Sequence, residues 1–224
     1  MKISVFIPCV PNHWPNIKNI VNAYNCGSVV PDEIVILLSD CGKVKNYHIP
    51  GSVTIAIERP LYAGPARQRA VNLCRGDIIM YNDADDLPHK DRVKIVKDVF
   101  EKNSDIMVLS HSYDYKEWSN GDVSKYKMYD AYNLLYEECF KDSDFMNCSV
   151  RGSFGDCAGF PVHAGVPCIR RDVLKVISWK HPKDLIVAPD PKTKTEDFEF
   201  CFECLYKYKH QHAIIDSKIY LYTG

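Results

Sequence analysis

Short apolar segments alternate with amphipathic ones along the first half of the chain. The apolar segments are rich in β-branched residues, which is typical of buried strands. The amphipathic segments carry apolar residues three and four positions apart, which is typical of helices that cover one face of a sheet. The alternation predicts an α/β fold with a mixed, mostly parallel sheet sandwiched by helices. The predicted strands are residues 3–8, 33–38, 53–57, 77–81 and 106–110.

Three helices are predicted between these strands. One begins at Pro15 and another at Pro65, and proline suits the first turn of a helix. The third follows an acidic cluster after the fourth strand, with Val93, Val96 and Phe100 on its inward face.

The second half of the chain is less regular. Residues 112–160 show no clean period, and an irregular stretch of this kind in a compact domain is typical of binding loops. Residues 166–177 predict a strand and the start of a helix, 195–207 a clear helix, and 213–222 a closing strand. No repeat or linker divides the sequence, so we expect a single domain over residues 1–224.

Composition excludes several classes of protein. The chain has 224 residues, of which 46% are hydrophobic, and this is enough for a sizeable core. Its net charge of −1 gives no basic field that would attract nucleic acid or an anionic membrane. No apolar run approaches the roughly 20 residues of a membrane span. Pro8 and Pro11 interrupt the amino-terminal run, which favours a first strand over a signal peptide.

The ten cysteines are scattered, and several fall in apolar segments, where reduced cysteines pack as small apolar residues. Cys201 and Cys204 form a C-x-x-C pair, but no second pair or nearby histidine pair completes a zinc site. We therefore expect core packing in a reducing compartment. The expected location is the cytoplasm, with the chain free, peripheral to a membrane or part of a larger protein.

Three carboxylates, Asp83, Asp85 and Asp86, follow directly on the strand at 77–81. Carboxylates this close repel one another and are costly to desolvate unless a cation compensates. In an extended D-x-D, alternate side chains share a face, and such a pair can hold Mg²⁺ or Mn²⁺ together with substrate phosphates. The alternative is an acidic first turn that complements a helix dipole.

Position favours the metal site over the helix cap. Ligands of open α/β sheets bind beyond the carboxyl ends of the strands. The second predicted strand ends at Asp40, and the third leads into the turn "YAGPARQRA". These ends are expected to converge on one crevice with the acidic cluster.

The segments "SVFIPCVPN", "EIVILLSD", "YAGPARQRAVNLCRGDIIMYNDADD" and "TEDFEF" together resemble the GT-A glycosyltransferases, most closely the inverting family 2 type. The resemblance covers essentially the whole chain, in order. It implies metal-dependent transfer of a hexose-type sugar from a nucleotide diphosphate, with a UDP-sugar favoured, to a hydroxyl of a glycan or glycoconjugate. It also implies a nucleotide-sugar-binding half at 1–110 and an acceptor-binding and catalytic-base half at 111–224.

The resemblance assigns donor-binding residues in the first half. The first strand and the end of the second bind the nucleotide in that family, and they match Ile7, Pro8 and Asp40. The family's Gly-x-x-Arg matches Gly64 and Arg67, with Arg67 near the nucleotide or diphosphate.

The same resemblance assigns the metal and catalytic residues. The family's D-x-D matches Asp83, toward the ribose or metal, and Asp85, on the Mn²⁺ or Mg²⁺ ion. Its downstream Glu-Asp pair matches Glu196 and Asp197, with Asp197 as the base. A base at the start of a helix can accept the proton of the incoming hydroxyl, and a single displacement inverts the anomeric centre. Without the resemblance, two acids at a helix start are better explained by the helix dipole.

The acceptor side is less defined. Asp156, His163 and Gly165 are expected to line the sugar pocket, although His163 suits a structural position equally well. Trp118 either stacks on a sugar ring or belongs to a loop core. The last strand lacks the histidine that often follows in the family. The Gln-x-x-Arg-Trp motif of processive members and membrane helices are also absent from the sequence, so synthesis of a long extruded polymer is not expected.

Two other functions remain open. A nucleotidyltransferase also combines an α/β sheet with acidic metal ligands, but would normally carry a Gly-rich signature where this chain reads "PCVPNHWPN". A non-catalytic nucleotide-sugar-binding module of the same fold is disfavoured only because Asp83, Asp85 and Asp197 are all present.

Overall fold

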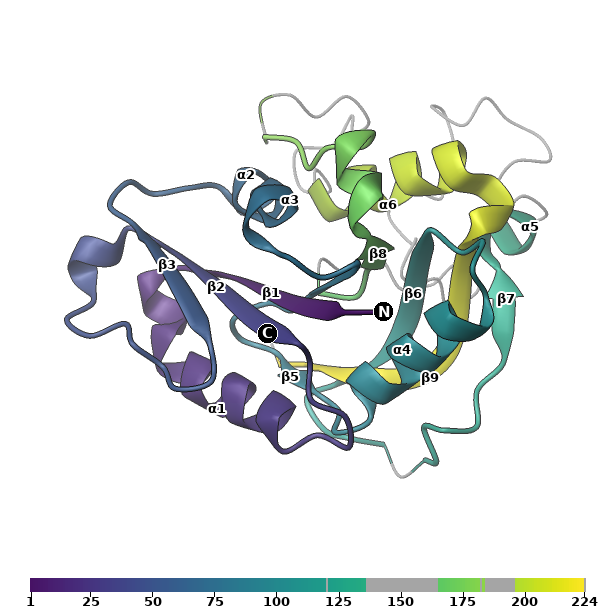
Figure 1. Ribbon diagram of the computed structural model, residues 1–224, viewed down its shortest axis with the longest axis horizontal. Helices are drawn as coiled ribbons and strands as arrows, with labels where there is room; N and C mark the ends of the chain where they lie inside the picture. Colours follow the sequence, from purple (N-terminus) through teal and green to yellow (C-terminus); the bar gives the residue numbers. More distant parts are fainter. Residues whose placement is uncertain (120, 136–164, 182, 184–195, 224) are drawn as a thin grey trace.

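The computed structural model describes residues 1–119, 121–135, 165–181, 183 and 196–223. Within these residues one sheet runs through the molecule in the order β3-β2-β1-β4-β8-β6-β9-β5, and β7 pairs with β9 (Figure 1). Helices cover both faces of this sheet (Figure 1). The predicted α/β class with a mixed, mostly parallel sheet is confirmed.

The first four strands are parallel and close to their predicted bounds. Every residue of β4 is buried, because helices lie on both sides of the sheet. The fifth predicted strand begins two residues later than expected and extends to Tyr115 as β6. The parallel strands are β1 (Ile3–Cys9), β2 (Glu33–Ser39), β3 (Val53–Ile57) and β4 (Ile78–Tyr81).

The second half adds antiparallel pairs to this sheet. The short strand β8 (Cys168–Arg170) lies antiparallel between β4 and β6 (Val108–Tyr115). The long strand β9 (His212–Tyr222) runs parallel to β6, with register shifts between them, and it bends along its length (Figure 1). Both β5 (Leu87–Pro88) and β7 (Met128–Asp130) pair antiparallel with β9.

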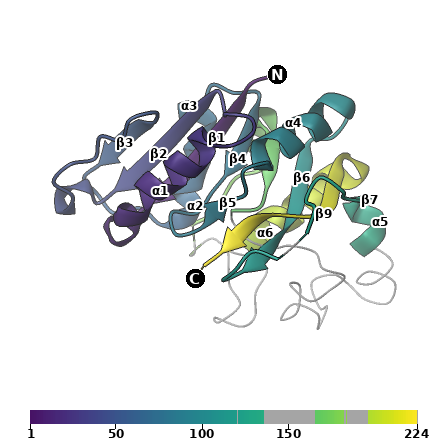
Figure 2. The same cartoon turned by 90° about the horizontal axis from the view of Figure 1, so that it is seen from below.

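Two apolar clusters fill the spaces on either side of the sheet. On one side, α1 (Trp14–Asn25) and α4 (Arg92–Lys102) pack on alternate residues of the parallel strands. On the other side lie α2 (Ala63–Gln68), α3 (Ala70–Leu73) and α6 (Glu196–Tyr208). In the view from below (Figure 2), α1 and α4 lie on the near side of the sheet. The remaining described α-helix is α5 (Ala131–Leu135).

Cys201 and Cys204 both lie on α6 as buried, free thiols. The prediction that this C-x-x-C pair is core packing is confirmed. No helix in the described part of the chain has the length and apolarity needed to cross a bilayer.

Candidate functional site

A pocket of about 260 Å³ lies where β1, β2 and β4 end. This is the edge at which ligands of open α/β sheets bind. The segments predicted to converge do so here. Pro8 and Cys9 come from β1, Ser39 from β2, Arg67 from α2, and Asp83 and Asp85 from the segment that follows β4.

The acidic segment is a turn rather than an extended strand. The Asp86 N–H donates to the Asp83 carbonyl at 3.2 Å, which closes a four-residue turn. The expectation of an extended D-x-D is therefore wrong, but the Asp83 and Asp85 side chains still line the same pocket. The helix-cap alternative is also wrong. The next helix, α4, begins only at Arg92 and has no acidic residue in its first turn.

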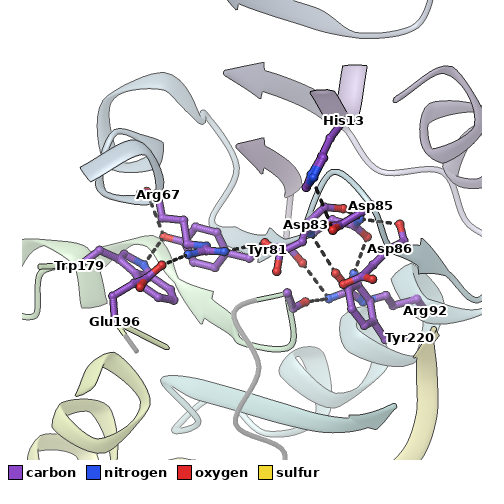
Figure 3. A network of polar contacts seen from close by, with 12 residues as sticks. His13, Arg67, Tyr81, Asp83, Asp85, Asp86, Arg92, Trp179, Glu196 and Tyr220 are labelled. Carbon is purple, nitrogen blue, oxygen red and sulfur yellow. Dashed lines mark hydrogen bonds and ion pairs between the residues drawn. The ribbon is translucent and has the colours of Figure 1, made fainter. Parts of the chain in front are cut away.

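Arg67 joins two of the predicted acids (Figure 3). Its Nη2 lies 2.7 Å from the Asp83 carboxylate and its Nη1 lies 2.8 Å from the Glu196 carboxylate. The guanidinium also stands over the Trp179 ring, 5.1 Å from its centroid. With 6% of its side chain exposed, Arg67 makes charge-assisted bonds that are little screened by water. It therefore fixes the acidic turn against the start of α6.

One donor of this arginine is left over. The Arg67 Nε–H is buried and has no hydrogen-bond acceptor among the residues described. Such a buried donor carries a free-energy cost until an acceptor reaches it. Arg67 lines the pocket through other atoms, so a ligand oxygen would reach this donor only after the side chain shifts.

Asp197 stands in the first turn of α6, next to Glu196. Burial raises the pKa of Asp197 to about 6, and repulsion from Glu196 and Asp83 adds to the rise, while Arg67 opposes it. A carboxylate with a pKa in this range is a more effective proton acceptor near neutral pH than an ordinary aspartate. Because Glu196 is paired with Arg67, Asp197 is the better placed of the two to act as a base.

Two predicted donor residues do not present their side chains to the pocket. Ile7 is fully buried in the core beneath α1, because alternate residues of β1 face opposite sides of the sheet, and it is its neighbour Pro8 that lines the pocket. Asp40 follows β2 in the left-handed region, with φ of 57°, and its carboxylate pairs with Lys43 at 2.5 Å. Ser39 lines the pocket in its place.

Gly64 does not line the pocket, and its backbone packs closely against the Lys180 segment. A Cβ at Gly64 would lie 2.0 Å from the backbone carbonyl oxygen of Lys180. The absence of a side chain lets α2 approach that segment, and α2 carries Arg67 to the pocket.

We expect Gly64→Ala to lower the free energy of unfolding by about 1–3 kcal/mol, because the backbone at Lys180 would have to move. Gly42→Ala is the matched control, since a Cβ there meets nothing within 4 Å, and its effect should stay within about 0.5 kcal/mol. Urea denaturation of both variants measures the difference. Equal stabilities would show that α2 accommodates the methyl group.

Gly165 is the only predicted acceptor residue in the described part of the chain, since Asp156 and His163 lie outside it. Gly165 is buried, and a Cβ there would lie 2.0 Å from the Tyr220 hydroxyl oxygen. Its carbonyl accepts a hydrogen bond from Arg92 Nη2 at 2.6 Å. In the structure this glycine packs beneath the acidic turn rather than lining the pocket.

Arg92 was missed by the sequence analysis, although it is the largest fully buried side chain described. Its Nε donates to His111, and its Nη1 donates to Tyr24 and Asn82. Its Nη2 donates to the carbonyls of Tyr81 and Gly165. The available signal was its position four residues before Val96, which places Arg92 on the inward face of α4.

Arg92 supports the acidic turn through two neighbours. Asn82 accepts from Arg92 and donates its Nδ2 hydrogens to the carbonyls of Asp83, at 2.7 Å, and Asp86, at 3.1 Å. The Tyr220 ring lies 4.6 Å from the Arg92 guanidinium, and its hydroxyl accepts the Asp83 N–H (Figure 3). The turn is thus held from below by buried polar groups.

Asp86 is buried beneath the same turn. Burial raises the pKa of Asp86 to about 7, and Asp83 and Asp85 add to the rise, while hydrogen bonds from Thr223 and Tyr220 oppose it. The Thr223 N–H donates to its carboxylate at 2.9 Å. Asp86 is therefore a structural member of the cluster, and Asp83 and Asp85 are the members that reach the pocket.

A divalent cation would find oxygen ligands at this turn. Asp83 and Asp85 supply carboxylates of the type that Mg²⁺ and Mn²⁺ prefer, and such ions usually take their other ligands from phosphates and water. Residues 1–119, 121–135, 165–181, 183 and 196–223 contain no preformed group of three or more His, Cys, Asp or Glu side chains suited to a metal. The donor set thus fits a cation that arrives with a phosphate ligand.

The curled, mixed sheet, with a carboxylate-lined pocket where its parallel strands end, is a GT-A fold. The family described as "Glycosyl transferase family 2" matches residues 4–164, and the chain belongs to that family. The resemblance to family 2 is thereby confirmed. No curated protein matches the chain.

Solved structures share the fold at low sequence identity. TarS 1–349 of S. aureus superposes with a TM-score of 0.63 at 17% identity, over 100% of this chain and 60% of that one. The complex of TarS 1–349 with UDP-GlcNAc superposes with a TM-score of 0.58 at 15% identity, over 100% of this chain and 59% of that one. A third structure is glucosyl-3-phosphoglycerate synthase from Mycobacterium tuberculosis in complex with Mn²⁺, UDP and glucosyl-3-phosphoglycerate. It superposes with a TM-score of 0.60 at 17% identity, over 98% of this chain and 71% of that one. The chain spans about 60% of the TarS 1–349 length, and these identities support the fold alone.

Proposed function

We propose that this chain transfers a sugar from a UDP-sugar to a hydroxyl group of a glycan or glycoconjugate, with inversion and with the help of Mn²⁺ or Mg²⁺. One observation carries the proposal. Arg67 holds Asp83 of the acidic turn and Glu196 of the α6 start on one guanidinium, with Asp197 beside them. The residues to which we assign diphosphate binding and proton removal thus come together from distant parts of the sequence.

The donor half of the site has to hold a diphosphate and release it. A divalent cation on Asp85, with Asp83 beside it, would supply positive charge for the departing diphosphate. Arg67 adds a fixed positive charge that is buried and needs no rearrangement, which is the most effective form of electrostatic help. Nucleotide complexes of TarS and of glucosyl-3-phosphoglycerate synthase support this placement by analogy of fold.

The acceptor half has to remove a proton. Asp197 would accept the proton of the acceptor hydroxyl as its oxygen bonds to the anomeric carbon, and the bond to the diphosphate breaks with its electron pair on UDP. One displacement at that carbon inverts its configuration. No carboxylate nucleophile is needed, so a single base suffices. We assign donor binding to residues 1–110 and the acceptor and base to residues 111–224.

Calorimetric titration with UDP, GDP and their sugars, with and without Mn²⁺, tests the donor class. Tight binding of one nucleotide that disappears with a chelator supports the proposal. Release of UDP with acceptor present separates a transferase from a binding module, which would bind without turnover. Release of inorganic diphosphate would instead identify a nucleotidyltransferase.

Asp85→Ala is expected to weaken UDP binding in the presence of Mn²⁺ and to leave metal-free binding unchanged. Loss of an outer-shell partner typically costs about 10- to 100-fold in metal affinity, so loss of a ligand should cost at least as much. Asp172→Ala is the control, because Asp172 is exposed and its described ion pair is with Lys175, away from the pocket. Unchanged affinity in Asp85→Ala would remove Asp85 as a ligand.

A further inference from the structure

His13 faces Asp85 across the pocket. The two side chains come from different elements, the 3₁₀ turn η1 (Pro11–His13) after β1 and the acidic turn after β4. Both line the pocket, and both are partly exposed, 41% for His13 and 34% for Asp85. The sequence analysis assigned no role to His13, which is separated from Asp85 by a long stretch of chain.

The contact between them is a poor hydrogen bond. His13 Nδ1 lies 3.6 Å from Asp85 Oδ2, beyond the range in which N–H···O bonds are effective. The Asp85 carboxylate makes no hydrogen bond or closer ion pair with any residue in the described part of the chain. Among the described residues, the Asp85 carboxylate therefore has one distant partner, His13.

The separation suits two ligands of one cation. With metal–ligand bonds of about 2.0–2.1 Å, two ligands at right angles stand about 3 Å apart. The observed 3.6 Å exceeds that distance by about 0.6 Å, which small rotations of these two partly exposed side chains can close. We propose that the His13 imidazole is a ligand of the divalent cation and shares it with Asp85. The proposal rests on the function proposed above.

The surroundings of the turn favour this side for the cation. On the other side, the Thr223 hydroxyl donates to the Asp85 carbonyl at 2.5 Å and the Thr223 N–H donates to Asp86. Below the turn lie Tyr220 and Arg92, while His13 reaches Asp85 from the opposite direction (Figure 3). A cation can therefore reach the Asp85 carboxylate from the side on which His13 lies.

The proposal is compatible with the ion pairs already present at the turn. Asp83 is paired with Arg67, so a cation bound by His13 and Asp85 does not require that ion pair to break. Diphosphate oxygens and water complete the coordination of such ions in nucleotide sites. An imidazole nitrogen suits transition metals better than Mg²⁺, so His13 should bias the site toward Mn²⁺.

Electron spin-echo spectroscopy of Mn²⁺ bound with UDP tests the proposal without measuring activity. The wild type should show a ¹⁴N coupling to Mn²⁺ that changes to the ¹⁵N pattern in protein labelled with ¹⁵N-histidine. His13→Gln should lose this coupling, and its Mn²⁺ affinity should fall more than its Mg²⁺ affinity. His48→Gln is the matched control, because His48 is an exposed histidine outside the pocket, and it should keep the coupling.

Two failures are distinguishable. UDP-dependent binding of Mn²⁺ without a histidine coupling would overturn the role of His13 and leave the proposed function standing. Absence of any UDP-dependent Mn²⁺ binding would overturn both. A coupling that persists in folded His13→Gln would assign the nitrogen to another histidine and would also overturn the proposal.

Discussion

Asp197→Asn is expected to keep UDP binding and to lose sugar transfer by about 10²–10⁴-fold, the range that a general base typically contributes. The substitution keeps the shape of the side chain and removes its ability to take a proton. Arg67 keeps its two ion pairs, with Asp83 and Glu196, so the donor side of the pocket should be unaffected. Calorimetry with UDP and steady-state release of UDP in the presence of an acceptor measure the two properties separately.

Glu196→Gln is the informative comparison for this prediction. It removes the negative charge that pairs with Arg67 at 2.8 Å, and it leaves the Asp197 carboxylate in place. We expect weaker donor binding with a smaller loss of turnover at saturating donor. If instead Asp197→Asn retains turnover and Glu196→Gln loses it, Glu196 is the base and the assignment made here is wrong.

The pH dependence of the transfer rate is a second test of Asp197 as the base. Because burial raises the pKa of Asp197 to about 6, the carboxyl group is protonated and inactive below that pH in the free protein. The rate at low donor concentration should therefore rise as pH increases through about 6 and level off above it. Asp197→Asn should lose this rise. A wild-type profile that is flat between pH 5 and 8 would contradict the assignment, since a base must be deprotonated to act.

Much of the fold was predictable because the first half of the chain alternates so regularly. Strands buried on both faces need continuous apolar residues, and β4 with its four buried residues shows the pattern plainly. The pocket location followed from topology, because parallel strands present their carboxyl ends at one edge. The antiparallel strand β5 is only two residues long, too short to leave a period in the sequence, whereas β8 falls within the strand predicted in residues 166–177.

The site was less predictable than the fold, for two physical reasons. Spacing cannot show that the acidic segment is a turn, since a turn and an extended strand place Asp83 and Asp85 equally close in sequence. It also cannot show which distant charges meet. The Arg67–Glu196 pair joins residues 129 positions apart, and only the packing of α2 on α6 brings them together.

Ile7 illustrates the same limit at a single strand. The family pattern marks Ile7 and Pro8 together, but alternate residues of a strand face opposite ways. Ile7 faces the core under α1, and Pro8 faces the pocket. The motif therefore identifies the right strand and turn, and the pleat decides which side chain has access to a ligand.

Arg92→Met is expected to destabilise the protein by about 3 kcal/mol or more. Methionine fills much of the volume of the arginine stem, but it removes the hydrogen bonds from Arg92 to the carbonyls of Tyr81 and Gly165 and one of the two that the Asn82 amide oxygen accepts. Each buried acceptor left unsatisfied costs about 1–3 kcal/mol, and water that enters the space recovers part of this. Arg59→Met, at an exposed arginine, should change stability by less than about 0.5 kcal/mol. Urea denaturation gives both values.

The same variant distinguishes a stabilising role from a role in shaping the site. Asn82 links Arg92 to the carbonyls of Asp83 and Asp86, so loss of the guanidinium should loosen the acidic turn as well as the core. Folded Arg92→Met, measured well below its unfolding midpoint, should bind UDP with Mn²⁺ more weakly than the wild type. Ile34→Ala is the control for lower stability alone, because Ile34 is buried at the start of β2, the end of the strand opposite to the pocket. Unchanged UDP affinity in folded Arg92→Met would mean that the turn keeps its shape without Arg92, and that this buried cation stabilises the core only.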